Sequence, residues 1–379
     1  MFRQTLAIAR NAFFESVRQP VLLILVLVTT LLLLLANPLS AFTMDDDHRM
    51  LVDIGLATVF MAGMLLAAFI ATSVLGQEIH NRTALTVVSK PVPRPAFVTG
   101  KFIGVAAAIV LGTANMGLVF LLVDQQAVLE TVRTPIHVPV IVFGTAAFLI
   151  GTAAATWCNY FYGFVFSSSW ICVTTPLLFI AYLLSLNFGP DFGQHAMAIG
   201  FRIDLWKALG AIMVAVLVLA GIAIAASTRL GQLPTLVVTL AIFFGGMMSD
   251  AWFGQPVHRI ESTWLDRAEL DGQTEIIERL RVMEKTNGDT EEVVTETVSP
   301  LPGVSLSSYA EGGEYLTWAG CRIGSAILPD FQVLWLADAL TQKNVVPGKY
   351  LARAVTYGGL YIVASLSIGI LLFQRREVT

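Results

Sequence analysis

The chain has 379 residues, of which 56% are hydrophobic and only 13% are charged, and its mean hydropathy is +0.73. Soluble domains carry about 25% charged residues, so this composition excludes an ordinary water-soluble fold and indicates a membrane protein. The net charge of −4 is small, and without a basic patch there is no basis for nucleic-acid binding. The cysteines Cys158, Cys172 and Cys321 form no spaced pair, so we expect neither a disulfide framework nor a metal site.

The first segment, Met1–Gln19, is predicted to be an amphipathic helix. Its apolar residues recur at three- and four-residue steps from Phe2 to Val17, with arginines around them. Such a helix lies flat at the cytoplasmic face of a membrane, with its arginines among anionic head groups. Pro20 then marks the bend into the first apolar stretch. A solvated basic tail is the alternative.

Eight apolar stretches follow that approach the length needed to cross a bilayer. A helix rises about 1.5 Å per residue, so crossing about 30 Å of hydrocarbon takes about 20 residues. The stretches lie near Val21–Phe42, Leu51–Leu75, Phe102–Val123, Pro139–Trp157, Phe164–Leu186, Ala208–Ala226, Leu236–Met248 and Ala354–Phe373. The seventh is the shortest, and the turn at Cys158–Gly163 carries no charge.

The placement of Lys and Arg in the short loops predicts the orientation, because these residues concentrate on the cytoplasmic side. With the N-terminus inside, the cytoplasmic loops hold Arg3, Arg10, Arg18, Arg82, Lys90, Arg94, Lys101, Arg229, Arg375 and Arg376. The short outer loops hold only Arg49, Arg133, Arg202 and Lys207. We therefore expect a multi-pass inner-membrane protein with both termini in the cytoplasm, which requires an even number of spans.

One extended polar region, from Gln255 to about Arg353, carries more than half of the acidic residues. It is expected to be an extracytoplasmic insertion (255–353) before the last span and the tail (354–379). Within it, Glu261–Lys285 is predicted to be helical and Thr286–Pro302 to be a loose loop. Tyr315–Leu340 is predicted to form short helices on the outer membrane surface, as interfacial Trp suggests. Two additional spans are the alternative, although they would bury charges at a high cost.

No catalytic motif stands out. The chain lacks a Walker A loop and an HExxH motif, and its five histidines lie far apart in the sequence. An intramembrane protease would need a paired nucleophile and base on spanning helices, which we do not find. The span interiors are nearly free of the ionisable groups that ion-coupled carriers place near the midplane. We therefore expect no enzyme activity and no cofactor in the chain itself, and an external source of energy.

The most informative loop, residues 76–101, joins the second and third spans. Glu78–Val88 can form about three helical turns, which the Pro91, Pro93 and Pro95 series ends. A short surface helix that is rigidly joined to two spans would act as a lever, because a partner pushing on it moves both spans.

This loop resembles that of the ABC-2 type permease family, including members near the permeases of nitrous-oxide-reductase maturation. The family's loop runs roughly Glu, three residues, Gly-Thr, then Leu-Leu-Ser-Lys-Pro-Val-Ser-Arg, an aromatic residue and Gly-Lys. The matching residues are Glu78, Thr83, Ser89, Lys90, Pro91, Val92, Arg94, Phe97, Gly100 and Lys101. Arg82 stands where the family usually has Gly, and Pro93 where it has Ser.

Three further segments resemble the family more weakly: residues 9–18, residues 225–230, and residues 328–331 together with the C-terminal stretch 357–377. The family commonly has six spans, so the Pro139–Leu186 hairpin looks like an additional pair. Pore geometry therefore cannot be carried over.

The resemblance implies a permease subunit, with an ABC ATPase subunit docking on the 76–90 loop and itself or a second permease as the dimer partner. The implied coupling residues are Glu78, Arg82, Thr83, Leu85, Ser89, Lys90 and Arg94. Glu78 and Arg82 are the expected main contacts, through charged pairs at a partly buried interface. We expect an exporter with an unknown substrate. A non-transporting scaffold that recruits an outer partner through 255–353, and a secondary carrier, are the competing functions.

The fold class expected is an all-α polytopic bundle of about eight transmembrane helices (21–254 and 354–379) with an N-terminal interfacial helix (1–20).

Overall fold

The structure is a computed structural model and describes residues 2–41, 47–80, 93–128, 136–193, 201–284, 290–341 and 346–374. The chain divides into two compact units. Unit 1 contains Met1–Leu240, Leu334–Thr341 and Val346–Thr379, and unit 2 contains Ala241–Val333 and Gln342–Val345. Each unit is described by itself.

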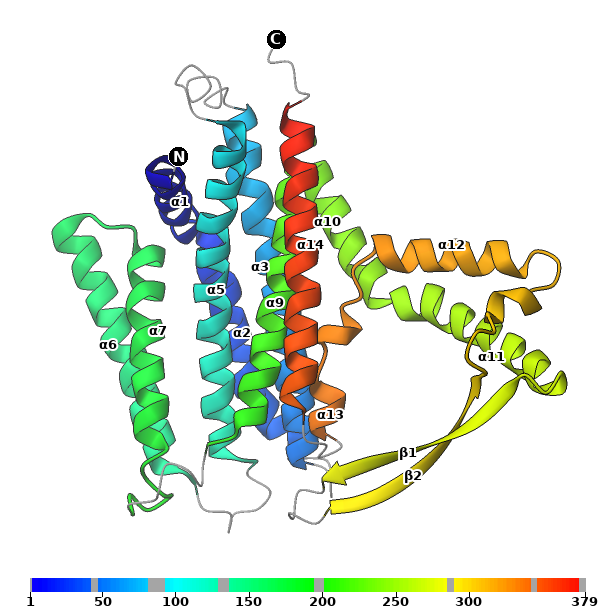
Figure 1. The fold of residues 1–379 in the computed structure, drawn as a ribbon. Coiled ribbons are helices and arrows are strands. Elements are labelled where there is room, and N and C mark those ends of the chain that lie inside the picture. The colour runs from blue at the N-terminus through cyan, green and yellow to red at the C-terminus, as the bar shows by residue number, and fades with distance from the viewer. Residues whose placement is uncertain are drawn as a thin grey trace. The chain divides into compact units, whose positions relative to one another are not determined.

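Unit 1 is a bundle of long apolar helices (Figure 1). They are α1 (Phe2–Val17), α2 (Pro20–Ser40), α3 (Asp47–His80), α5 (Arg94–Gln126), α6 (Val138–Tyr162), α7 (Phe166–Ser185), α9 (Ile203–Ser227), most of α10 (Gln232–Met247), the short α13 (Ala337–Thr341) and α14 (Gly348–Gln374). Within the described residues, seven helices are long and apolar enough to cross a membrane: α2, α3, α5, α6, α7, α9 and α14. The predicted polytopic helical bundle is confirmed at this level.

The eighth predicted span, Leu236–Met248, falls on α10, which has only 16 residues. A break follows α10, and the chain bends by 55° into the next helix. This bent pair counts as an eighth span only if both parts are taken together. The shortness of this stretch in the sequence therefore corresponds to a real interruption of the helix.

The helices α3, α5 and α9 form the core of unit 1. The most apolar stretch of α5 is 72% buried, whereas that of α14 is 17% buried. The large buried side chains of the core include Phe60 of α3 and Phe120 of α5. The exposed faces of α2, α6 and α14 are also apolar, as expected of helices that contact lipid.

Four chain segments meet at one end of the bundle, which we call the α1 end: α1, the end of α3, the start of α5 and the end of α14 (Figure 1). Ser73 of α3 donates a hydrogen bond to Gln19 just after α1, and the Phe97 ring of α5 stacks on Phe373 of α14 at 5.6 Å. The predicted N-terminal helix is therefore present, and it is packed onto the bundle.

Unit 2 contains the end of α10, a π-helical turn (Asp250–Gly254), α11 (Gln255–Leu270), the strands β1 (Thr274–Glu284) and β2 (Thr290–Pro300), a 3₁₀ turn (Leu306–Tyr309) and α12 (Glu314–Ile327). The two strands form an antiparallel hairpin whose register runs from Thr274 opposite Pro300 to Glu284 opposite Thr290. Another 3₁₀ turn (Gln332–Leu334) leads back toward unit 1.

Two sequence-based expectations for this region are wrong. The predicted helix Glu261–Lys285 ends at Leu270, and the predicted loose loop Thr286–Pro302 contains β2. The helix ends at a local turn. Gly272 adopts a positive φ of 67°, a conformation that favours glycine, and a strand begins two residues later. Both strands are rich in Thr, Val and Ile, which favour extended backbone, whereas α11 follows the 3.6-residue period.

The predicted short helices in Tyr315–Leu340 are present as α12 and α13. α12 has 14 residues, so it is too short to cross a bilayer, and no helix of spanning length occurs in the described residues between Asp271 and Thr341. The end of the segment is not a surface element, because Leu336 and Ala337 are buried and the Trp335 ring lies 5.3 Å from Phe60 of α3.

Two carboxylates join α11 to α12. Glu314 accepts hydrogen bonds from both terminal nitrogens of Arg267, at 2.7 and 3.0 Å, and from the Trp264 indole at 2.9 Å. Glu261 accepts hydrogen bonds from the Trp318 indole and from Arg322. Charge-assisted hydrogen bonds of this kind are stronger than neutral ones, so they hold the two helices in one arrangement.

Candidate functional site

Two of the predicted coupling residues lie in the described helices. Glu78 belongs to the last turn of α3, and Arg94 is the first residue of α5; the backbone of both is described, and their side chains are not. The other predicted coupling residues fall outside the described residues: Arg82, Thr83, Leu85, Ser89 and Lys90. The two helices that flank the 76–101 segment in the sequence, α3 and α5, pack against each other in the core.

The first turns of α5 hold α1 through close backbone contact. A Cβ atom on Gly100 would lie 2.9 Å from the carbonyl oxygen of Thr5. A Cβ atom on Gly104 would lie 2.7 Å from the Cβ of Ala12 and 2.8 Å from the backbone nitrogen of Phe13. Only glycine leaves room for α1 at these positions, so α1 lies directly against α5 at the α1 end.

A buried ion pair reinforces this contact. The Nζ atom of Lys101 lies 3.0 Å from the carboxylate of Glu15, and the Lys101 side chain is only 3% exposed. A lysine buried this deeply needs a partner, because an uncompensated buried charge is strongly destabilising. Gly100 and Lys101 match the family's Gly-Lys pair, and here both residues contact α1.

The Lys101–Glu15 pair was not anticipated from the sequence. One signal was available: Glu15 is the only acidic residue among the first 44 residues, within a helix that is otherwise basic and apolar. A lone carboxylate in such a helix indicates a specific partner. Its identity depends on packing, since the two residues are 86 positions apart.

A second group of charges joins the core helices at the opposite end of the bundle. Asp124 near the end of α5 accepts hydrogen bonds from Arg202 at 2.8 and 3.0 Å, just before α9 begins. The same Arg202 nitrogen lies 2.6 Å from Nε2 of His48 in the first turn of α3. Three core helices are therefore linked by side chains at the end away from the 76–101 segment.

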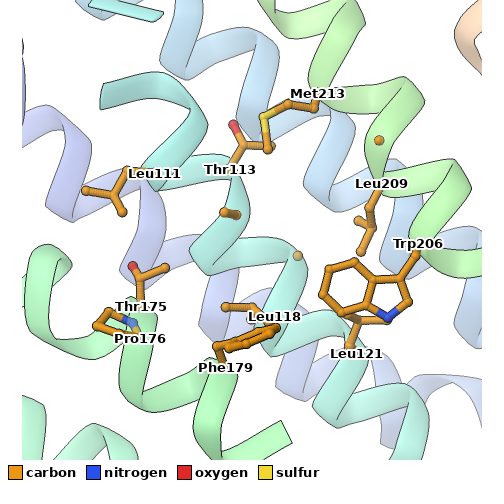
Figure 2. Close-up of a pocket in the computed structure, with 13 residues that line it drawn as sticks. Leu111, Thr113, Leu118, Leu121, Thr175, Pro176, Phe179, Trp206, Leu209 and Met213 are labelled. Atoms are coloured by element: carbon orange, nitrogen blue, oxygen red, sulfur yellow. The ribbon is translucent and has the colours of Figure 1, made fainter. Parts of the chain in front are cut away.

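A cavity of about 610 Å³ lies between α5, α7 and α9 (Figure 2). Side chains from all three helices point into it, among them Leu111 and Leu121 of α5, Phe179 of α7, and Trp206 and Met213 of α9. The residues that line it in the described chain include no charged group. The interior was expected to be uncharged, but the cavity itself could not be read from the sequence.

No protein-family model matches the chain, and no curated protein matches it. The resemblance to ABC-2 permeases therefore rests on the residues of the 76–101 loop and on the three segments that match more weakly.

Among the described residues, no group of three or more His, Cys, Asp or Glu side chains is placed to hold a metal ion. Two charged contacts stand out among the described residues: the Lys101–Glu15 pair, which joins α5 to α1, and the Asp124–Arg202 pair at the far end of the bundle.

Proposed function

We propose that the chain is the permease subunit of an ABC transporter in the inner membrane, with both termini in the cytoplasm. A separate ATPase subunit hydrolyses ATP, and the permease moves a substrate across the membrane, in the direction of export. The observation that carries the proposal is the 76–101 segment, which has the family's residue pattern and joins two core helices of the bundle.

In this proposal the ATPase docks on Glu78–Ser89, with Glu78 and Arg82 forming charged contacts. Closure of the ATPase around ATP presses the segment and tilts α3 and α5. The Lys101–Glu15 pair makes α1 move with α5. The Asp124–Arg202 junction holds the far ends of the core helices together, so it acts as the pivot.

A functional transporter of this type needs two permeases around a shared path, supplied by a second copy or by a different permease. The exposed apolar faces of α6 and α14 are available for that contact or for lipid, with Leu149 of α6 72% exposed and Leu360 of α14 67% exposed. The uncharged cavity is compatible with a hydrophobic substrate.

Charge reversal at Glu78 tests the docking assignment. The Glu78→Lys variant, reconstituted with its ATPase, is expected to lose the permease-dependent stimulation of ATP hydrolysis because the charged contact becomes repulsive. Membrane insertion should stay normal. The matched control is Glu269→Lys, which reverses an exposed charge on α11 and should leave stimulation unchanged. Normal stimulation in Glu78→Lys would remove Glu78 from the interface.

A membrane scaffold is the second candidate, favoured by the separate compact unit 2 with its Arg267–Glu314 and Arg322–Glu261 pairs. An ordered polar unit of this kind suits the recruitment of an extracytoplasmic partner. Affinity purification of the tagged chain separates the two functions: the permease predicts a co-purifying Walker-type ATPase, and the scaffold predicts an outer partner without one.

A further inference from the structure

The cavity between α5, α7 and α9 has the depth of one membrane leaflet. It follows α5 from Leu111 to Leu121, which corresponds to about 15 Å of helix at a rise of about 1.5 Å per residue. The hydrocarbon core of a bilayer is about 30 Å thick, so the cavity extends over about half of it. Its volume of about 610 Å³ lies in the range of sites that hold small molecules, about 300–1,000 Å³.

The lining of the cavity selects an apolar ligand. Its wall on α5 is aliphatic apart from Thr113, whose hydroxyl has no hydrogen-bond partner among the described residues. The rings of Phe179 and Trp206 meet edge to face at 6.4 Å on the other helices. The Thr175 hydroxyl already donates to the carbonyl of Ile171 and accepts from the Asn115 amide. Sites for polar molecules bring together several free polar groups, and the described lining contains no such group of side chains.

Side-chain hydrogen bonds hold α7 at three heights along the bundle. Ser167 donates to the carbonyl of Arg18 at 3.2 Å, Thr175 accepts from Asn115 at 3.0 Å, and Ser185 donates to Gln125 at 2.6 Å. The second and third bonds join α7 to α5 near its middle and its end, and the first joins α7 to the chain between α1 and α2. The side-chain hydrogen bonds of α7 therefore help to keep the cavity beside it open.

Gly210 of α9 shows that the space is open. A Cβ atom built on Gly210 meets no atom of the described residues within 4 Å, although small residues in membrane helices usually permit close helix contact. A void of this size leaves its lining without partner atoms and forfeits their dispersion contacts. An occupant that follows the irregular lining restores those contacts.

We propose that this cavity binds one acyl chain of a bilayer lipid, which enters sideways from the membrane. The length of an acyl chain matches the depth of one leaflet, and its hydrocarbon matches the charge-free lining. Its flexibility lets the acyl chain follow the wall of the cavity from Trp206 to Met213. This inference depends on the helices spanning a membrane and is independent of the ATPase and of transport.

Photolabelling of the full chain in lipid nanodiscs tests the proposal. The probe is phosphatidylcholine with a diazirine in the middle of one acyl chain, and mass spectrometry locates the adducts. In the native chain, adducts are expected on residues 111–121, 175–179 and 206–213. Gly210→Phe fills the space and should lower this labelling about tenfold, as expected when a large side chain occupies a pocket. Labelling at Leu360 on the exposed face of α14 should be unchanged.

Gly359→Phe is the matched control, because Gly359 is also a helical glycine whose Cβ would meet no described atom within 4 Å, and it lies on α14. It should leave the cavity labelling at the native level. Gly210→Leu, which is smaller, should reduce the labelling in the same direction if Gly210→Phe does not fold.

Two results would overturn the proposal. One is the absence of cavity adducts in the native chain while Leu360 is labelled. The other is cavity labelling that occurs in discs with one copy of the chain and disappears in discs with two, since a second copy would then be the occupant. The nanodiscs contain no ATPase, so a negative labelling result contradicts the acyl-chain site and does not bear on the transport proposal.

Discussion

The glycines at the start of α5 show how single residues set the contact between α1 and the bundle. Gly100 and Gly104 leave α1 close enough for Lys101 to reach Glu15. Lys101 lies two turns into a helix of the apolar core, where a lysine without a partner would be strongly destabilising. The backbone contact and the ion pair therefore depend on each other.

Gly104→Leu is expected to destabilise the chain by about 1–3 kcal/mol, because the added side chain meets the backbone of α1 and overpacks the contact. Thermal unfolding in detergent, followed by the loss of monodisperse protein, measures the effect. Gly359→Leu adds the same side chain where a Cβ has open space, so it should unfold near the native temperature. Equal melting temperatures for the two variants would contradict the close packing of α1 on α5.

At the scale of elements, the helices α11 and α12 are joined by the Arg267–Glu314 ion pair, which requires Glu314 to be ionised. Hydrogen bonds from Arg267, and then from Trp264, lower the pKa of Glu314 from its ordinary 4.5 to about 2. A carboxylate with a lowered pKa stabilises the folded state above its ordinary value, and this contribution is lost as pH falls from 4.5 through about 2.

Acidification from pH 5 to pH 2 is therefore expected to loosen α11 from α12. The protection factors of the α12 amides, which compare each exchange rate with its intrinsic rate at the same pH, should fall over this window. Glu314→Gln removes the titrating group, so the variant should exchange faster at pH 5 and change less on acidification than the native chain. Glu269→Gln, at an exposed carboxylate of α11, is the control. An acid response of Glu314→Gln equal to the native one would show that this carboxylate does not hold the helices.

The hairpin of β1 and β2 is a case in which one sequence pattern fits both a helix and a strand. Its first strand contains Leu280 and Met283 at a spacing that also fits a helix, and this spacing led to the prediction of one helix up to Lys285. The strand is stabilised by pairing along its whole length with β2, from Thr274 opposite Pro300 onward. A pattern read over one segment does not include the partner strand, so the extended alternative was missed.

At the scale of the whole chain, the described α1 and the end of α14 lie at the same end of unit 1 (Figure 1). This arrangement supports the proposal that both ends of the chain face the same side of a membrane. The positive residues in the predicted inner loops are the basis for proposing that this side is the cytoplasm.

Cysteine labelling with a membrane-impermeant reagent checks this arrangement in a variant without the native cysteines. A cysteine added at either terminus should react in inverted vesicles and stay protected in right-side-out vesicles. Asp191→Cys, in the exposed turn after α7 at the opposite end, should show the reverse pattern. Termini that are labelled from different sides would contradict the shared end.

The sequence alone predicted the bundle of apolar helices that are long enough to cross a membrane, because the bilayer requires about 20 apolar residues in each span, and seven of the eight predicted stretches fall on helices that meet this requirement. It also indicated the 76–101 segment and the helix at the N-terminus. Only the tertiary structure decided which charges pair, such as Lys101 with Glu15 and Arg202 with Asp124, and where a cavity stays open beside Gly210. The pairs join residues 86 and 78 positions apart. Such contacts depend on how helices pack against one another, and a local pattern carries no record of the neighbouring helix.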